Sequence, residues 1–100
     1  MPLPNPIIVD LFDISFKPSR TAIDHIADVI EDYGFNVQDI NDYDVNIWYT
    51  FSEGTKKGEL IVNRMDRTFE LLAEQDGGKY PPAIFKDFEL VEDFLRLLKG

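Results

Sequence analysis

The chain has 100 residues, of which 44% are hydrophobic and 13% aromatic, and its 19 acidic residues outnumber 10 lysines and arginines to give a formal net charge of -9. This length and composition suffice for the core of one domain but not of two, so we expect a single domain over residues 1–100. The chain has no cysteine, which excludes disulfide frameworks, thiolate catalysis and zinc fingers.

The sequence predicts no membrane segment. Its longest apolar runs, PIIV and LLA, are far below the roughly 18 residues that a spanning helix needs. The first residues also lack the basic and then apolar pattern of a signal peptide. We therefore expect a cytoplasmic protein that does not bind membranes.

Residues 5–16 allow two interpretations. The Asn5-Pro6 pair suits the start of a helix, and the apolar residues at positions 7, 8, 11 and 12 fit a helical stripe. The apolar residues Phe12, Ile14 and Phe16 alternate instead as they would in a strand. We favour a short helix here.

The segment from Ser19 to Gly34 has the pattern of an amphipathic helix, because Ser19 can cap its start and Gly34 can end it. Its apolar residues recur at helical spacing and are Ile23, Ile26, Ala27, Ile30 and Tyr33. The opposite side carries four acids, Asp24, Asp28, Glu31 and Asp32. One side of this helix should therefore be buried and the other strongly negative.

Three strands and a second helix are expected in the rest of the chain. The runs VNIWYTF (45–51) and GELIVNR (58–64) predict a hairpin, and RTFELLA (67–73) predicts a third strand. EQDGGKYPPAIF (74–85) is typical of a loop because of its Gly-Gly and Pro-Pro pairs. DFELVEDFLRLLKG (87–100) predicts a helix, with Asp87 as its cap and with the inward-facing residues Val91, Phe94, Leu95 and Leu98.

The predicted fold is a small α+β domain in the order α(α)βββα. Each element must bury its one apolar side against another element. We therefore expect a three-stranded antiparallel sheet with helices mainly on one face.

Nearly all of the excess negative charge lies in one third of the chain. Between Thr21 and Thr55 there are eight acids and no lysine or arginine, whereas the remaining residues carry eleven acids against ten bases. The eight acids are Asp24, Asp28, Glu31, Asp32, Asp39, Asp42, Asp44 and Glu53. An even spread would serve solubility as well, and blocks of like charge often mark segments that interact with a partner.

The acids of the first helix have a spacing close to that of a nucleic-acid strand. From Asp24 to Asp32 the helix advances about 12 Å and carries four charges, roughly one per 4 Å, compared with ~3.4 Å between the charges of one strand. This density would suit a basic groove. The alternative is an ordinary solvated helix surface on an acidic protein.

Trp48 is the candidate aromatic anchor of an interface. In the strand VNIWYTF it alternates with Ile47 and Tyr49, so it should lie on the sheet face that the helices leave open. Tryptophan is enriched among the residues that contribute most to binding energy. The alternative is that the N-terminal segment packs over Trp48 and buries it.

The sequence predicts no catalytic residue, cofactor or metal site. The single histidine, His25, has no serine or cysteine tied to it by a recognised motif. The residues at 42, 44, 46 and 53 match the acidic positions of an EF-hand, but Ile47 stands where that loop requires glycine. Incidental divalent binding by the predicted loop from Asp39 to Asp44 is the metal alternative.

These features favour a non-enzymatic module that binds a basic surface of another protein. Its most concrete form is an inhibitor of a nucleic-acid-processing protein, of the immunity, anti-restriction or anti-CRISPR type, acting as a nucleic-acid mimic. We expect no direct nucleic-acid binding, because that depends on lysines and arginines that displace counterions. The partner-binding residues predicted are Asp24, Asp28, Glu31, Asp32, Asp39, Asp42, Asp44 and Trp48.

Two other functions remain open from the sequence. One is an accessory subunit or housekeeping domain with an apolar interface, for which the acids provide only solubility. The other is a small metal-dependent enzyme that uses the predicted loop from Asp39 to Asp44. The oligomeric state is not indicated by any pattern in the chain.

Overall fold

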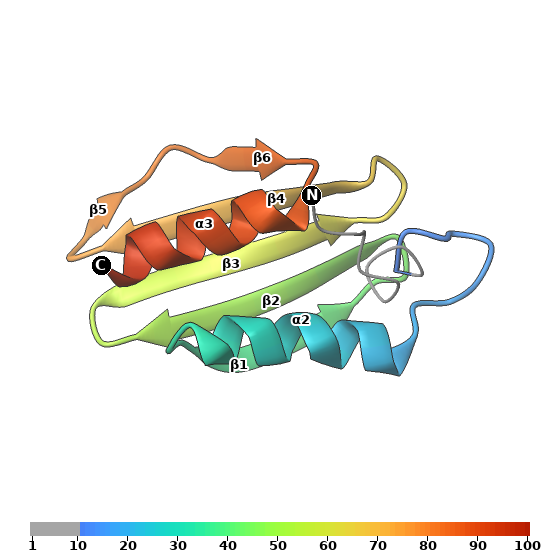
Figure 1. Cartoon of the computed structure of the whole chain (residues 1–100), viewed down its shortest axis with the longest axis horizontal. Helices are drawn as coiled ribbons and strands as arrows, with labels where there is room; N and C mark the ends of the chain where they lie inside the picture. The colour runs from blue at the N-terminus through green and yellow to red at the C-terminus, as the bar shows by residue number, and fades with distance from the viewer. Residues whose placement is uncertain (1–10) are drawn as a thin grey trace.

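The computed structural model describes residues 11–100, and these form two helices and a six-stranded antiparallel sheet (Figure 1). In chain order the elements are α2 (Arg20–Asp32), β1 (Asn36–Asp42), β2 (Asn46–Glu53), β3 (Lys56–Asn63), β4 (Thr68–Gln75), β5 (Gly78–Lys79), β6 (Ala83–Phe85) and α3 (Phe88–Lys99). The α+β prediction with an antiparallel sheet and two helices is confirmed.

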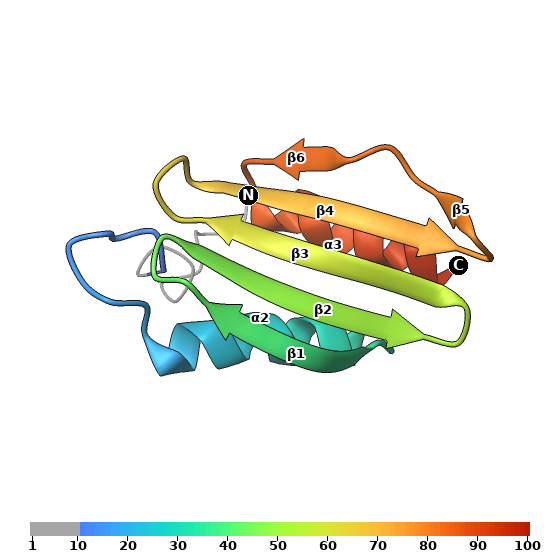
Figure 2. The ribbon, with the colours of Figure 1, turned by 180° about the vertical axis from the view of Figure 1, so that it is seen from behind.

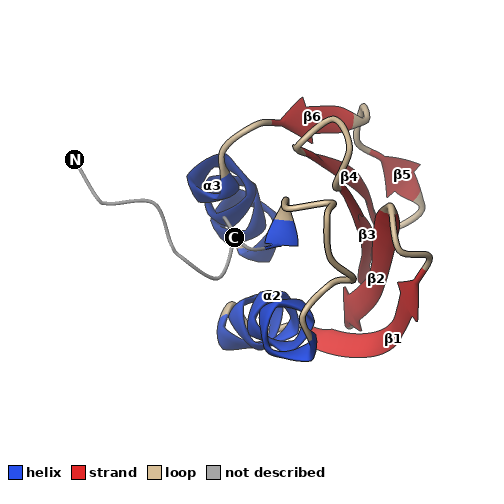
Figure 3. Ribbon diagram, turned by 90° about the vertical axis from the view of Figure 1, so that its right-hand side faces the viewer, coloured by secondary structure: helices blue, strands red, loops and turns tan. Residues whose placement is uncertain are grey.

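The sheet is an antiparallel meander in which the first four strands lie side by side in chain order. The short strands β5 and β6 both pair with β4 and cover its outer edge. Both helices lie on one face of the sheet, and the other face is seen uncovered when the molecule is turned round (Figures 2 and 3). The structure is therefore a two-layer arrangement with one helix-covered face and one helix-free face.

Helix α2 forms where the apolar spacing predicts it. Ser19 occupies the N-cap position, although its side chain makes no capping hydrogen bond. Gly34 follows the helix with a φ of +95°, a left-handed conformation that ends helices readily. The buried residues of the helix are Ala22, Ile23, Ile26, Ala27 and Ile30. The predicted Tyr33 lies at the edge of this face, half-buried, and donates a hydrogen bond to Glu92 of α3 at 3.1 Å.

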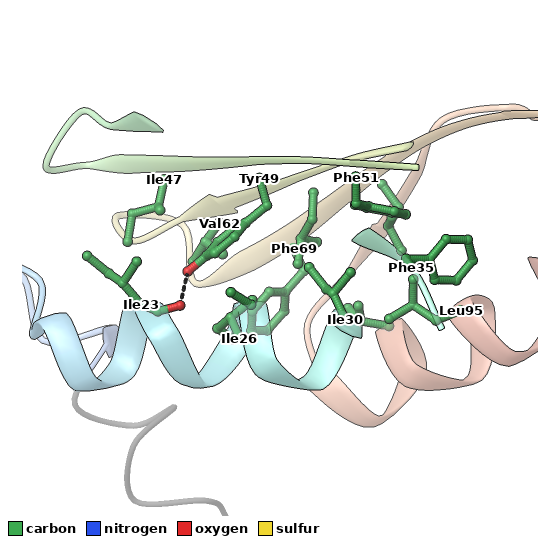
Figure 4. Close-up of a cluster of buried hydrophobic side chains, with 14 of the residues drawn as sticks. Ile23, Ile26, Ile30, Phe35, Ile47, Tyr49, Phe51, Val62, Phe69 and Leu95 are labelled. Atoms are coloured by element: carbon green, nitrogen blue, oxygen red, sulfur yellow. Dashed lines mark hydrogen bonds between the residues drawn. The ribbon is translucent and has the colours of Figure 1, made fainter. Parts of the chain in front are cut away.

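The core lies between the helices and the inward residues of the three central strands (Figure 4). Along β2 the residues Ile47, Tyr49 and Phe51 are buried, while the residues between them are partly exposed. The Tyr49 hydroxyl donates a hydrogen bond of 2.8 Å to the backbone carbonyl of Ile23 in α2, drawn as a dashed line in Figure 4. This bond fixes the depth at which α2 packs on the sheet.

The prediction of three strands is wrong, because the sheet has six. The sequence of strand β1, NVQDIND, predicts a loop because it has only two apolar residues and four that are typical of turns. It pairs with β2 through a register shift between Val37 and Asp39. Strands β5 and β6 flank the Pro81-Pro82 pair, which stays outside both of them.

The two interpretations of residues 5–16 are decided only in part. Residues 5–10 lie outside the described residues. The described part, residues 12–16, turns instead of extending, so the alternation of Phe12, Ile14 and Phe16 does not form a strand. Leu11 is fully buried in the core between sheet and helices.

Neither described helix has the length and apolar composition needed to cross a membrane.

Candidate functional site

Helix α2 directs its acids away from the core. Asp28, Glu31 and Asp32 are exposed, and Asp24 is half-buried. They occupy the side of the helix opposite its buried isoleucines, because residues three and four apart share one face of a helix. The four acids therefore share the outward side of α2, as the apolar spacing of the helix predicts.

Strand β1 adds two further acids beside this helix. It is the strand nearest to α2 at one long edge of the molecule (Figure 3). Burial raises the pKa of Tyr49, and the negative charges of Asp24 and Asp42 raise it further. Asp39 is exposed on the helix-free face, opposite Thr50.

We call this strip of α2 and β1 the acidic surface. Its members are Asp24, Asp28, Glu31, Asp32, Asp39 and Asp42. Six of the eight predicted partner-binding residues thus lie along one edge of the molecule, running from the outer side of α2 around β1.

Bases from outside the acidic third of the chain neutralise some of its carboxylates. Arg20 pairs with Asp24 at 3.2 Å, within the same helix. Lys99 of α3 pairs with Glu53 at 2.7 Å, and this hydrogen bond lowers the pKa of the Glu53 carboxyl. Within residues 11–100, no lysine or arginine forms an ion pair with Asp28, Glu31, Asp32, Asp39 or Asp42. The negative charge of the acidic surface is therefore largely uncompensated.

Asp44 belongs to a different part of the structure, because it pairs with Arg64 at 3.1 Å. The side chain of Arg64 is only 1% exposed, and Arg64 is the buried charged residue of the described chain. Its Nε donates to the Leu11 carbonyl at 2.6 Å and its Nη1 to the Asp44 carbonyl at 2.8 Å. Its Nη2 donates to the carbonyls of Asp13 and Phe16, each at 2.7 Å.

Sequence reasoning missed Arg64, although alternation along the strand contains the signal. Leu60 and Val62 face the core, and Arg64 follows at the same parity just beyond the end of β3. A buried guanidinium requires partners for its donors, and here two loops supply them.

The loops held by Arg64 form one end of the molecule, which we call the clamped end and define as residues 11–16, 43–45 and 64–66. Figure 1 draws the loop before α2 and the turns β1–β2 and β3–β4 at the same end. The exposed fractions of its large apolar residues are 54% for Ile14, 71% for Phe16, 64% for Tyr43, 37% for Val45 and 62% for Met65. Five exposed large apolar side chains therefore belong to loops at this end of the molecule.

Trp48 lies on the helix-free face, as its alternation with Tyr49 predicts, and is half-buried there. It pairs across the sheet with Asn41 on one side and with Ile61 on the other. Ile61 is 8% exposed although it lies outside the main core cluster. Trp48 therefore contributes to a small apolar patch on this face and lies away from the acids of α2.

The predicted loop from Asp39 to Asp44 is a strand as far as Asp42, and only Tyr43 and Asp44 lie in the turn that follows. Asp39 and Asp42 lie in β1 on opposite sides of the sheet, because Asp42 pairs with the inward Ile47 and Asp39 with the outward Thr50. Among residues 11–100, no group of three or more histidines and carboxylates is arranged to hold a metal ion. His25 is half-buried on α2.

The described surface contains an open depression of about 200 Å³ near the β4–β5 turn. It is lined by Gln75, Asp76, Gly78, Lys79 and Tyr80. None of these side chains is buried, so the depression offers no desolvated polar group for catalysis.

No protein-family model, curated protein or solved structure matches this chain.

Proposed function

We propose that the protein is a non-enzymatic binding module whose acidic surface occupies a basic site on another protein. The observation that carries the proposal is the group of five carboxylates on α2 and β1 that form no ion pair with a lysine or arginine within residues 11–100. Complementary charge accelerates association and disfavours wrong partners. A basic partner would also relieve the repulsion among these carboxylates.

Within this class we propose a nucleic-acid-processing protein as the partner. The four acids of α2 average about one charge per 4 Å of helix axis, near the ~3.4 Å between the charges of one nucleic-acid strand. A groove that binds a phosphate backbone presents lysines and arginines at matching intervals. The module would then act as an inhibitor by excluding nucleic acid from that groove.

The test exchanges charge on one helix and compares it with the same exchange on the other. Asp28→Lys/Asp32→Lys changes the net charge by four units on α2. Glu89→Lys/Asp93→Lys makes the same change at exposed positions four residues apart on α3. Each tagged variant is used to capture proteins from cell lysate at low and high salt, and captured proteins are identified by mass spectrometry.

We expect the unmodified protein and the α3 variant to capture the same basic proteins and to release them as salt rises. The α2 variant should lose them. Added double-stranded DNA should compete with capture if the partner site is a nucleic-acid groove. If both variants lose the captured proteins equally, net charge and not the position of the acids controls capture, and the proposal is contradicted. If the α2 variant captures the same proteins as the unmodified protein, the proposal is also contradicted.

A second candidate is an accessory subunit with an apolar interface, and the exposed apolar residues of the clamped end favour it. For such a protein the acidic surface provides solubility only. Capture would then survive Asp28→Lys/Asp32→Lys and would respond little to salt, because apolar burial is not screened.

A further inference from the structure

The buried guanidinium of Arg64 immobilises backbone whose side chains face the solvent. Its donors reach four carbonyls, of which three belong to residues 11–16 and one to the β1–β2 turn. Burying a charge is unfavourable unless its donors find partners, and here Nε, Nη1 and Nη2 all do, so the guanidinium holds this loop in one conformation. The loop it holds presents Ile14 and Phe16 to solvent, at 54% and 71% exposure.

The exposed apolar residues of the described chain concentrate at this end. Nine large apolar side chains are exposed within residues 11–100, and five of them belong to the clamped end. Aromatic side chains on a backbone fixed in advance bind with a smaller loss of conformational entropy than those on a mobile loop. Phe16 and Tyr43, at 71% and 64% exposure, are the aromatic members.

The charges at this end indicate what kind of partner fits it. Exposed acids adjoin these apolar residues in the sequence, namely Asp13, Asp42, Asp44 and Asp66, and of these Asp44 is paired with Arg64. The adjoining exposed bases are Lys17 and Arg67. Asp42 also belongs to the acidic surface, so the two regions are continuous. A second copy of this chain would bring like charges together, and so would an anionic membrane, whereas a basic protein would not.

We propose that the clamped end is the anchor of the same interface, with Phe16 and Tyr43 inserting into an apolar pocket bordered by lysines or arginines of the partner. This inference rests on the proposed function and adds the residues that give the complex its lifetime. Long-range charge brings the partner to the acidic surface, and the buried aromatic side chains then slow its release.

The test uses two defined peptides of equal charge. One has six lysines alternating with six glycines, and in the other a tryptophan and a leucine replace two of the glycines. Affinity is measured by fluorescence anisotropy, and the contacted residues are mapped by amide chemical shifts. We expect the apolar peptide to bind at least about 5-fold more tightly and to shift residues 14–16, 43–45 and 65 in addition to the acidic surface.

Phe16→Ser/Tyr43→Ser should remove the preference for the apolar peptide and leave the lysine-glycine peptide unaffected. The matched control is Leu90→Ser/Leu97→Ser, which removes two exposed apolar residues of α3, at 45% and 72% exposure. This control should keep the preference. Thermal melts of both variants should match that of the unmodified protein, since all four side chains are exposed.

The outcomes separate the two proposals. If neither peptide binds, the proposed function fails and this inference with it. If both bind with equal affinity and shift only the acidic surface, the inference alone is overturned. A preference that survives Phe16→Ser/Tyr43→Ser overturns it too. Sedimentation provides a further test. If the unmodified protein dimerises with rising concentration and Phe16→Ser/Tyr43→Ser does not, the inference is overturned, because a second copy of the chain would then occupy the clamped end.

Discussion

At the scale of single residues, Arg64 has the most demanding environment in the described chain. Five hydrogen bonds from its guanidinium join two loops that are far apart in sequence. Asp44, one of its partners, adopts a φ of 71°, which aspartate tolerates better than most residues. An ammonium group could not replace this planar fork of donors, because its three donors cannot reach both loops from one point.

We predict that Arg64→Ala lowers the free energy of unfolding by about 3 to 5 kcal/mol, since buried carbonyls and Asp44 lose their partner. Arg64→Lys should cost about 2 kcal/mol and speed amide hydrogen exchange in residues 12–16. Urea denaturation and exchange measurements check both values. Arg67→Ala, at an exposed neighbour, is the control and should change stability by less than about 0.5 kcal/mol. If Arg64→Ala also changed the free energy of unfolding by less than about 0.5 kcal/mol, Arg64 would not hold the two loops as proposed.

At the scale of elements, a tight contact between two strands shapes the core beside α3. Gly58 of β3 pairs with Phe51 of β2 on the inward face, and a Cβ at position 58 would overlap the Phe51 ring. The ring in turn packs edge-on against Phe35, with centroids 5.2 Å apart. Glycine at this position therefore makes room for an aromatic pair that joins β2 to the segment after α2.

We predict that Gly58→Ala lowers the free energy of unfolding by about 1 to 3 kcal/mol, because Phe51 must leave its position. Adding Phe51→Leu to Gly58→Ala should recover part of this loss, since the smaller side chain leaves space for the methyl group. Gly77→Ala serves as a comparison, because a Cβ there meets no atom within 4 Å and only its φ of +83° is strained. Full additivity of the changes at 51 and 58 would argue against direct contact.

The sequence predicted the elements whose own residues define one buried face. Helices α2 and α3 and strands β2 to β4 each carry an apolar period that agrees with their final structure. Strand β1 is different, because it pairs along the sheet edge with few apolar residues and its two aspartates are typical of a loop. Alternation with Leu60 and Val62 places Arg64 on the inward side, but its partners are loop carbonyls that leave no pattern in the sequence.

At the scale of the whole molecule, the two helices carry opposite arrangements of charge. Helix α3 has Glu89 in its first turn and Arg96 and Lys99 in its last turn, which suits the helix dipole. Helix α2 has no acid in its first turn and no base in its last turn, where Glu31 and Asp32 lie instead. We therefore expect the acids of α2 to reduce the stability of the isolated protein. The proposed binding to a basic partner would give them a reason to be there.

The same pair of charge exchanges should consequently have opposite effects on stability. Asp28→Lys/Asp32→Lys replaces repulsion among the α2 acids with attraction and places a base in the last turn, so it should raise the free energy of unfolding by about 0.5 to 1.5 kcal/mol at low salt. Glu89→Lys/Asp93→Lys should lower it by a similar amount, because it removes a favourable first-turn acid and the ion pair of Asp93 with Arg96. Both differences in the free energy of unfolding should become smaller as salt approaches about 1 M, where the screening length falls to about 3 Å. Urea melts across a salt series measure the two trends. If the α2 variant is less stable than the unmodified protein, the carboxylates at positions 28 and 32 stabilise the fold. Their presence would then need no basic partner to explain it, which would contradict the argument for such a partner.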